Sequence, residues 1–213
     1  KNATTHRKGI VTYWTDEWNG KEDELLKSCT RVHHKARELG ATVIYDSIGV
    51  GAGCGAKFNE LNQTNKCSVK HAKFNAGAAV VKPEALYERA AGIKNKDFFT
   101  NLKSQSWWCV ADRFRLTYQV VNAIKNGETP PPYQLDELIS ISSKCPNLEK
   151  LKIKLSMPMR DFDNNGRVKV ESKKDLAKRD IKSPNIADSF ILAYAPINSG
   201  LTIRPDALTG FFS

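Results

Sequence analysis

Residues 43–58 read VIYDSIGVGAGCGAKF, which places an acid and a run of glycines directly after a short apolar segment. The apolar segment is typical of a buried strand, and it ends in Asp46. A P-loop needs Gly-Lys-Ser or Gly-Lys-Thr, which does not occur here, and a dinucleotide turn needs glycine where Cys54 or Ala56 stands. We therefore interpret the glycines as clearance for a backbone, a metal ion or a nucleic-acid phosphate. They are Gly49, Gly51, Gly53 and Gly55.

Asp46 has two interpretations at this stage. It ends a buried strand of the parallel type, and open α/β sheets place their chemistry at the carboxyl ends of such strands. Its side chain is equally suited to capping the turn that follows. The pattern alone favours neither.

Asp188 lies in the first turns of the last predicted helix, SPNIADSFILAY at 183–194, which opens with a Ser cap and a proline. It shares a helix face with Asn185 and Leu192. Among so many apolar residues an acid is poorly placed unless it has a cation or another partner. A solvated acid near a helix N-terminus is the alternative, and it stays open here.

The composition is that of an ordinary globular chain with a basic balance. Its 213 residues carry a formal net charge of +10, which favours a polyanionic partner. Five cysteines occur without a CxxC pair, which argues against a zinc site or a disulfide framework and for a reducing compartment. No apolar run reaches the length of about 18 residues that a membrane span requires, and no signal peptide is predicted.

The order of the predicted elements indicates an α/β domain. A hairpin at 3–15 turns at Lys8-Gly9, a helix at 17–40 ends at Gly40, and a strand at 41–46 follows. Further predictions are a helix at 56–63, a strand at 68–71, a long helix at 95–127 capped by Asn95 or Asp97, and a short helix from Gln134.

Residues 143–182 are strongly basic, with 12 Lys and Arg against 6 Asp and Glu. The alternation of KLKIKL and of RVKV, with DNNG between them as a turn, predicts an auxiliary β-hairpin over 150–172 with one basic face. Such a face suits contact with the phosphate backbone of duplex DNA. The candidate residues are Lys152, Lys154, Arg160, Arg167 and Lys169.

Three segments together carry a resemblance to a known family: VIYDSIGVGAG, WWCVADRFRLTY and RDFDNNGRVKVESKKDLAKRDIKSPNIADSFILAY. Over nearly the whole chain, the sequence resembles the C-terminal nuclease domain of the large terminase subunit of tailed, headful-packaging bacteriophages. The resemblance implies an RNase H-like mixed sheet flanked by helices, with residues 1–213 forming a single nuclease domain. It also implies a metal-dependent endonuclease that cuts concatemeric double-stranded DNA during packaging.

The family site that this resemblance implies uses three acids to hold two Mg²⁺ or Mn²⁺ ions. Asp46 matches the second acid and Asp188 the third, while Lys182 is a candidate for holding a phosphate. The first acid is expected on a strand upstream of Lys1, with Asp16 as a candidate substitute.

The resemblance also implies partners. They are double-stranded DNA, an N-terminal ATPase domain of the same polypeptide, the portal protein and the small terminase subunit, in the host cell cytoplasm and with no membrane. No Walker A motif occurs in these residues. The alternative function is a catalytically silent module that grips DNA or docks on the portal or motor.

Overall fold

The computed structural model describes residues 1–20 and 24–197 and begins with the predicted hairpin. Strands β1 (Asn2–Lys8) and β2 (Val11–Trp18) pair antiparallel, and β5 (Ser140–Ile141) adds to β2 in parallel, which gives a mixed sheet. Gly9 makes the turn with φ +56°, a conformation that glycine adopts without strain. Strands β3 (Val43–Asp46) and β4 (His71–Phe74) form a second, parallel pair. The predicted mixed α/β fold is confirmed.

The helices connect these strands. Helix α1 (Leu25–Leu39) ends at Gly40, as predicted, but it begins later than residue 17 because β2 continues to Trp18. Helix α2 (Cys54–Thr64) follows a short 3₁₀ turn at Gly49–Gly53. The strand predicted at 68–71 lies slightly later, as β4.

The long helix predicted at 95–127 is interrupted. A short α3 (Asn95–Phe98) precedes α4 (Leu102–Lys125), because Phe99 and Asn101 are extended and cannot continue a helix. The side chain of Asn101 caps α4 by accepting a hydrogen bond from the Ser104 amide at 3.0 Å. The cap is therefore neither Asn95 nor Asp97. None of the helices in the described part of the chain is long and apolar enough to cross a bilayer.

The predicted auxiliary hairpin is wrong in its first half. Residues 150–155 lie in helix α5 (Leu148–Ser156), and only β6 (Arg160–Phe162) and β7 (Val168–Val170) form the antiparallel hairpin. Leu148, Leu151 and Leu155 form a helical stripe, and Leu151 is fully buried in the core around the final helix. A short α6 (Lys173–Lys178), capped by Ser172, follows the hairpin.

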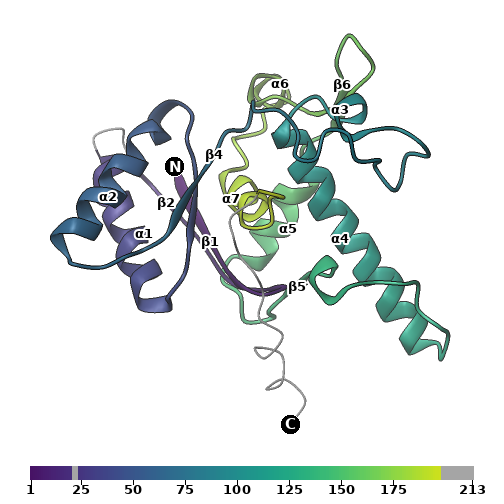
Figure 1. Cartoon of the computed structure of the whole chain (residues 1–213), viewed down its shortest axis with the longest axis horizontal. Helices are drawn as coiled ribbons and strands as arrows, with labels where there is room; N and C mark the ends of the chain where they lie inside the picture. Colours follow the sequence, from purple (N-terminus) through teal and green to yellow (C-terminus); the bar gives the residue numbers. More distant parts are fainter. Residues whose placement is uncertain (21–23, 198–213) are drawn as a thin grey trace.

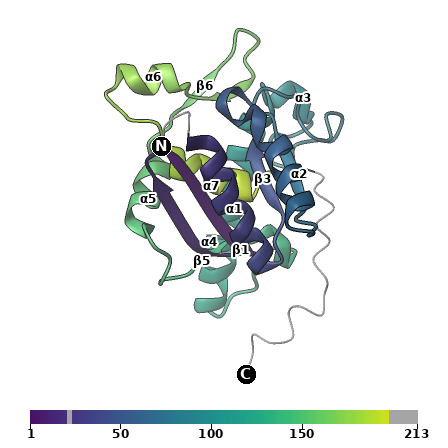
Figure 2. The same ribbon diagram turned by 90° about the vertical axis from the view of Figure 1, so that its left-hand side faces the viewer.

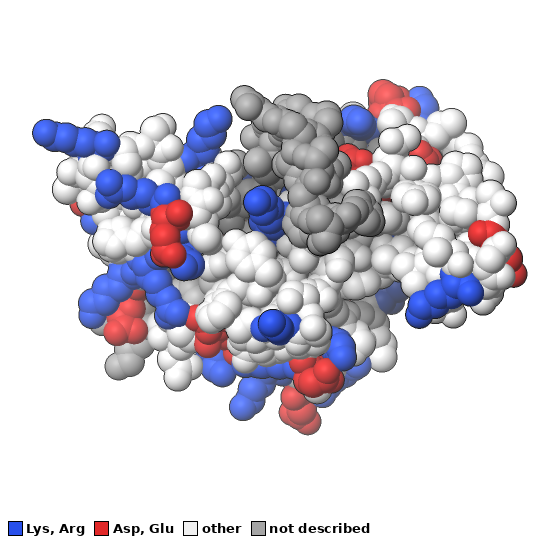
Figure 3. All heavy atoms as spheres, turned by 90° about the horizontal axis from the view of Figure 1, so that it is seen from below, with Lys and Arg blue, Asp and Glu red and all other residues white. Residues whose placement is uncertain are grey.

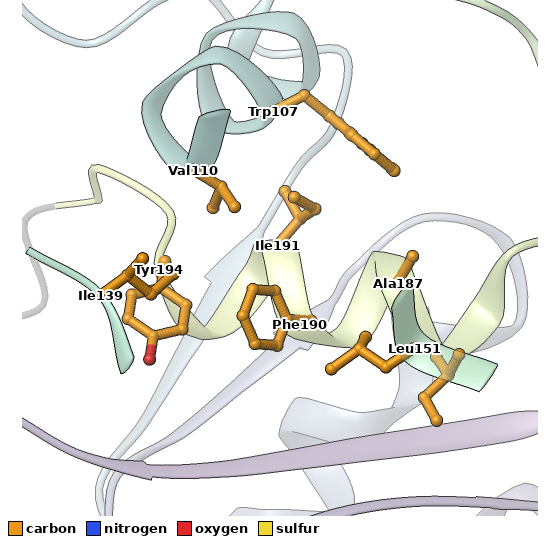
Figure 4. Packing of buried hydrophobic residues seen from close by; sticks show 9 residues of the cluster. Trp107, Val110, Ile139, Leu151, Ala187, Phe190, Ile191 and Tyr194 are labelled. Carbon is orange, nitrogen blue, oxygen red and sulfur yellow. The ribbon is translucent and has the colours of Figure 1, made fainter. Parts of the chain in front are cut away.

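Helix α7 (Asn185–Ala193) is the centre of the main hydrophobic core. Ile186, Ala187, Phe190 and Ile191 are at most 1% exposed. Figure 4 shows Ile191 pointing from α7 toward Trp107 and Val110 of α4. Pro184 rather than Ser183 is the N-cap. The Ser183 hydroxyl instead donates a hydrogen bond to the side-chain oxygen of Asn185 at 2.8 Å.

Helices α1 and α7 bridge the two sheets from opposite sides (Figures 1 and 2). Helix α7 contacts β1, β2 and β3. Helix α1 packs on β3, and its Ser28 hydroxyl accepts hydrogen bonds from Asn2 and Trp18 of the hairpin. Among the described residues, β1 pairs only with β2, and β3 pairs only with β4. Each of these two strands therefore has one edge without a strand partner.

Candidate metal centre

Asp46 is the last residue of β3, and its side chain is exposed. One carboxylate oxygen accepts a hydrogen bond from the Ile48 amide at 3.0 Å, so the capping interaction suggested by the sequence is present. The other oxygen has no hydrogen-bond partner in residues 1–20 and 24–197. Capping and metal binding are therefore compatible at this position, because a carboxylate accepts through both oxygens.

Two of the glycines after Asp46, Gly51 and Gly55, make room for the protein's own β3. A Cβ atom on Gly51 would lie 1.9 Å from the backbone carbonyl oxygen of Asp46, and one on Gly55 would lie 2.3 Å from the Tyr45 hydroxyl. Gly49 and Gly53 both have open space around them, and Gly49 has φ +60°. Gly51 therefore does provide clearance, but for the backbone of Asp46, whose position it fixes.

Asp188 lies in the first turn of α7, where its amide donates to the Pro184 carbonyl at 2.8 Å. Its side chain is 25% exposed, so it is not the freely solvated acid of the alternative interpretation. Burial raises the pKa of Asp188 above its ordinary value, against the opposing effect of Lys173 and Lys103, and the nearby Asp46 raises it further. The electrostatic effect of Asp46 on Asp188 places the two acids in one cluster.

The expected cationic partner of Asp188 is present, and it is a lysine. The ammonium of Lys173, at the start of α6, lies 3.7 Å from an Asp188 carboxylate oxygen. Lys103, in the first turn of α4, interacts electrostatically with Asp188, Lys173 and Asp46, and burial lowers its pKa. Neither lysine was predicted, because nothing in the sequence around them distinguishes them from solvated lysines.

The donor atoms of this cluster fit a hard divalent cation, which prefers carboxylate oxygens. The ammonium of Lys173 already occupies a cation position beside Asp188. In the part of the chain that the structure describes, no group of three acids, histidines or cysteines could hold a metal. Asp16 does not join Asp46 and Asp188, because it pairs with Arg31 in a groove of about 390 Å³ between the hairpin and α1.

The predicted DNA-contacting residues lie on α5 and on the hairpin, except for Lys182, which lies between α6 and α7. Most already have a partner: Lys152 pairs with Glu149 at 2.7 Å, Arg167 with Asp163 at 2.8 Å, Lys169 with Asp161 at 3.0 Å, and Arg160 stacks over Phe162. Lys154 donates to the backbone carbonyl of Lys182 at 3.1 Å, which brings two of the predicted residues together. Figure 3 shows the molecule from below the view of Figure 1, and on this face basic and acidic side chains are interspersed. DNA contact by these residues stays a prediction.

A scan against protein families and a search of curated proteins each found no match. Solved structures do match. The nuclease domain of the large terminase subunit gp2 of bacterial virus Sf6 has a TM-score of 0.76 at 27% identity, covering 89% of this chain and 80% of that chain.

Two other structures of the same domain, both lysine-to-alanine mutants, also match. One, solved with manganese, has a TM-score of 0.74 at 26% identity, with coverage of 89% and 81%. The other, solved with manganese and beta-thujaplicinol, has a TM-score of 0.75 at 26% identity, with coverage of 89% and 80%.

Fold and site together define an RNase H-like α/β domain with acids at the carboxyl end of a strand and the start of a late helix. The resemblance suggested by the sequence motifs is confirmed: the chain has the fold of the nuclease domain of a bacteriophage large terminase subunit.

Proposed function

We propose that this chain is a divalent-metal-dependent endonuclease that cuts concatemeric double-stranded viral DNA during genome packaging. The observation that carries the proposal is the nearness of Asp46 and Asp188, which lie on the contacting elements β3 and α7 and belong to one electrostatic cluster. Matching terminase nuclease domains have been solved with manganese and with calcium, which supports a metal-dependent role.

Asp46 and Asp188 would hold the metal. Two Mg²⁺ or Mn²⁺ ions would supply an activated water and stabilise the leaving 3′ oxygen. The chain's own residues prepare the site. Burial makes the Asp188 carboxylate costly when charged, which favours binding of a cation. The close contact of Gly51 with the Asp46 backbone fixes the end of β3.

We further propose that a strand from sequence preceding Lys1 pairs between β1 and β3 and carries the third acid. Both strands have an edge without a strand partner among the described residues, and strand edges left open are a liability that proteins usually cover. Helices α1 and α7 already bridge the two sheets. A central strand here would also explain why the described residues hold only two acids in the cluster.

The proposed partners follow from this role. Double-stranded DNA would lie on Lys152, Lys154, Arg160, Arg167, Lys169 and Lys182. An N-terminal ATPase domain of the same polypeptide, the portal protein and the small terminase subunit would complete the packaging machine in the host cytoplasm. Ion pairs on exposed residues are weak, so their acids do not prevent the basic side chains from binding phosphate.

The test is nicking of supercoiled plasmid with Mn²⁺ by a protein that includes the sequence preceding Lys1. Asp46→Ala and Asp188→Ala are expected to abolish metal-dependent cutting, whereas Asp136→Ala, at an exposed acid outside the cluster, is the matched control. Cutting that survives Asp46→Ala would refute the assignment of that residue.

A second candidate function is a catalytically silent module that grips DNA or docks on the portal or motor. It is favoured by the Lys173–Asp188 ion pair and by the presence of only two acids in the described cluster. Retained DNA binding without any cutting by the extended protein would select this function.

A further inference from the structure

Lys103 is a further charged group of the cluster that holds Asp46, Asp188 and Lys173, and main-chain contacts fix the position of its backbone. Asp46 is the register partner of Phe74 in the β3–β4 pair. Two residues after Phe74, the carbonyl of Ala76 accepts a hydrogen bond from the Lys103 amide at 3.0 Å. The start of α4 is thus tied to the same sheet end as Asp46.

The side chain of Lys103 is partly buried but not paired. Its electrostatic partners are Asp188, Lys173 and Asp46. In the part of the chain that the structure describes, no carboxylate oxygen lies within ion-pair distance of its ammonium, whereas Lys173 does pair with Asp188. A desolvated ammonium without a hydrogen-bond acceptor is costly, so the position suits an anionic ligand from outside the chain.

The first backbone amides of α4 are not free to bind that anion. The amides of Leu102, Lys103, Ser104 and Gln105 donate to Ala78, Ala76, the Asn101 side chain and the Asn101 carbonyl, respectively. Since these first amides of the helix are used, the free donor at this end is the Lys103 ammonium.

We propose that Lys103 binds a non-bridging oxygen of the DNA phosphate that lies at Asp46 and Asp188 when the strand is cut. This inference rests on the proposed nuclease function and adds a substrate-contacting residue to it. Cations bound by the two acids would repel the ammonium and leave the phosphate as its natural partner. An ammonium at that oxygen also stabilises the charge that develops on the phosphate during displacement.

The test uses the protein with the sequence preceding Lys1 and compares Lys103→Ala and Lys103→Met with Lys125→Ala. Met keeps the length of the buried stem if the alanine variant folds poorly, and Lys125 is an exposed lysine at the other end of the same helix. Binding of duplex DNA in Ca²⁺ is measured by fluorescence anisotropy over a range of salt concentrations. Cutting is measured at saturating Mn²⁺, and Mn²⁺ affinity by calorimetry.

Both Lys103 variants are expected to lower the slope of log K against log salt by about 0.9, the contribution of one phosphate contact, and Lys125→Ala is not. They are also expected to slow cutting on the order of 100-fold or more. If Lys103 only offsets the negative charge of the two carboxylates, the variants change Mn²⁺ affinity or melting temperature, while the salt slope and the cutting rate stay unchanged. That result overturns the inference.

Failure of the nuclease function gives a different result. If the unmodified protein cuts no DNA but the slope still falls in the Lys103 variants, the phosphate contact stands and catalysis does not. If the protein cuts and both Lys103 variants match it in slope and rate, the nuclease function stands and this inference is refuted.

Discussion

Replacing Gly51 with alanine tests how the backbone of Asp46 is held. The added Cβ would lie 1.9 Å from the Asp46 carbonyl oxygen, whereas real contacts of this kind stay beyond 3.0 Å. The two atoms must therefore separate by about 1 Å, and neither belongs to a flexible side chain. Overpacking of this kind costs about 1–3 kcal/mol. For a chain of this size the melting temperature should fall by roughly 2–12 °C.

A displacement of about 1 Å at Asp46 should also cost function, on the order of 100-fold in cutting rate. The matched control is Gly53→Ala, in the same 3₁₀ turn, where the backbone is helical and a Cβ meets nothing within 4 Å. That variant should be neutral or up to about 1 kcal/mol more stable. Thermal melting and Mn²⁺ calorimetry of both variants measure the difference. Equal melting temperatures and equal Mn²⁺ affinities would refute the view that Gly51 positions Asp46.

Three further predictions concern the cluster and α5. Asp188→Asn should raise the melting temperature of the metal-free protein at pH 7 and remove Mn²⁺ binding. Burial raises the pKa of Asp188, so the charged carboxylate destabilises the folded protein at pH 7. The gain in melting temperature should vanish below about pH 4, where Asp188 is protonated in the folded and in the unfolded chain. Lys173→Ala should tighten Mn²⁺ binding several-fold in calorimetry, because no ammonium must leave Asp188. Leu151→Ala should cost about 2–5 kcal/mol in urea unfolding and the exposed Ile153→Ala much less; equal losses would contradict the helix.

Much of the fold was predictable because local pattern and tertiary packing agree. The hairpin has its turn at Lys8-Gly9, the strand ending at Asp46 is a short apolar run, and the final helix opens with a serine and a proline. Residues 150–155 were mispredicted because KLKIKL alternates like a strand, while Leu148, Leu151 and Leu155 also fit a helix. Packing of Leu151 in the core around α7, a segment more than thirty residues later, favours the helix.

The acids of the candidate site could be singled out from the sequence, and the lysines beside them could not. Asp46 and Asp188 stand in motifs whose position after a strand and within a helix already suggests chemistry. Lys103 and Lys173 stand in the polar segments NLKSQ and SKKDL, which read as ordinary surface. They lie near the acids because α4 is anchored to the residues just after β4 and because Lys173 at the start of α6 pairs with Asp188 of α7, and no local pattern encodes either arrangement.

The central position of α7 has a consequence for how the protein is made. Hydrogen bonds join Thr5 to Ser189 and Ile10 to Tyr194, pairs that are each 184 residues apart. At ribosomal speeds the hairpin is synthesised roughly 10–40 s before the helix that covers it. During that interval the hairpin face that carries Thr5 and Thr12 lacks the helix that later covers it, and such long-range closure is intrinsically slow. Chaperone dependence and growth temperature should therefore govern the yield of soluble protein more strongly than the stability of the finished fold does.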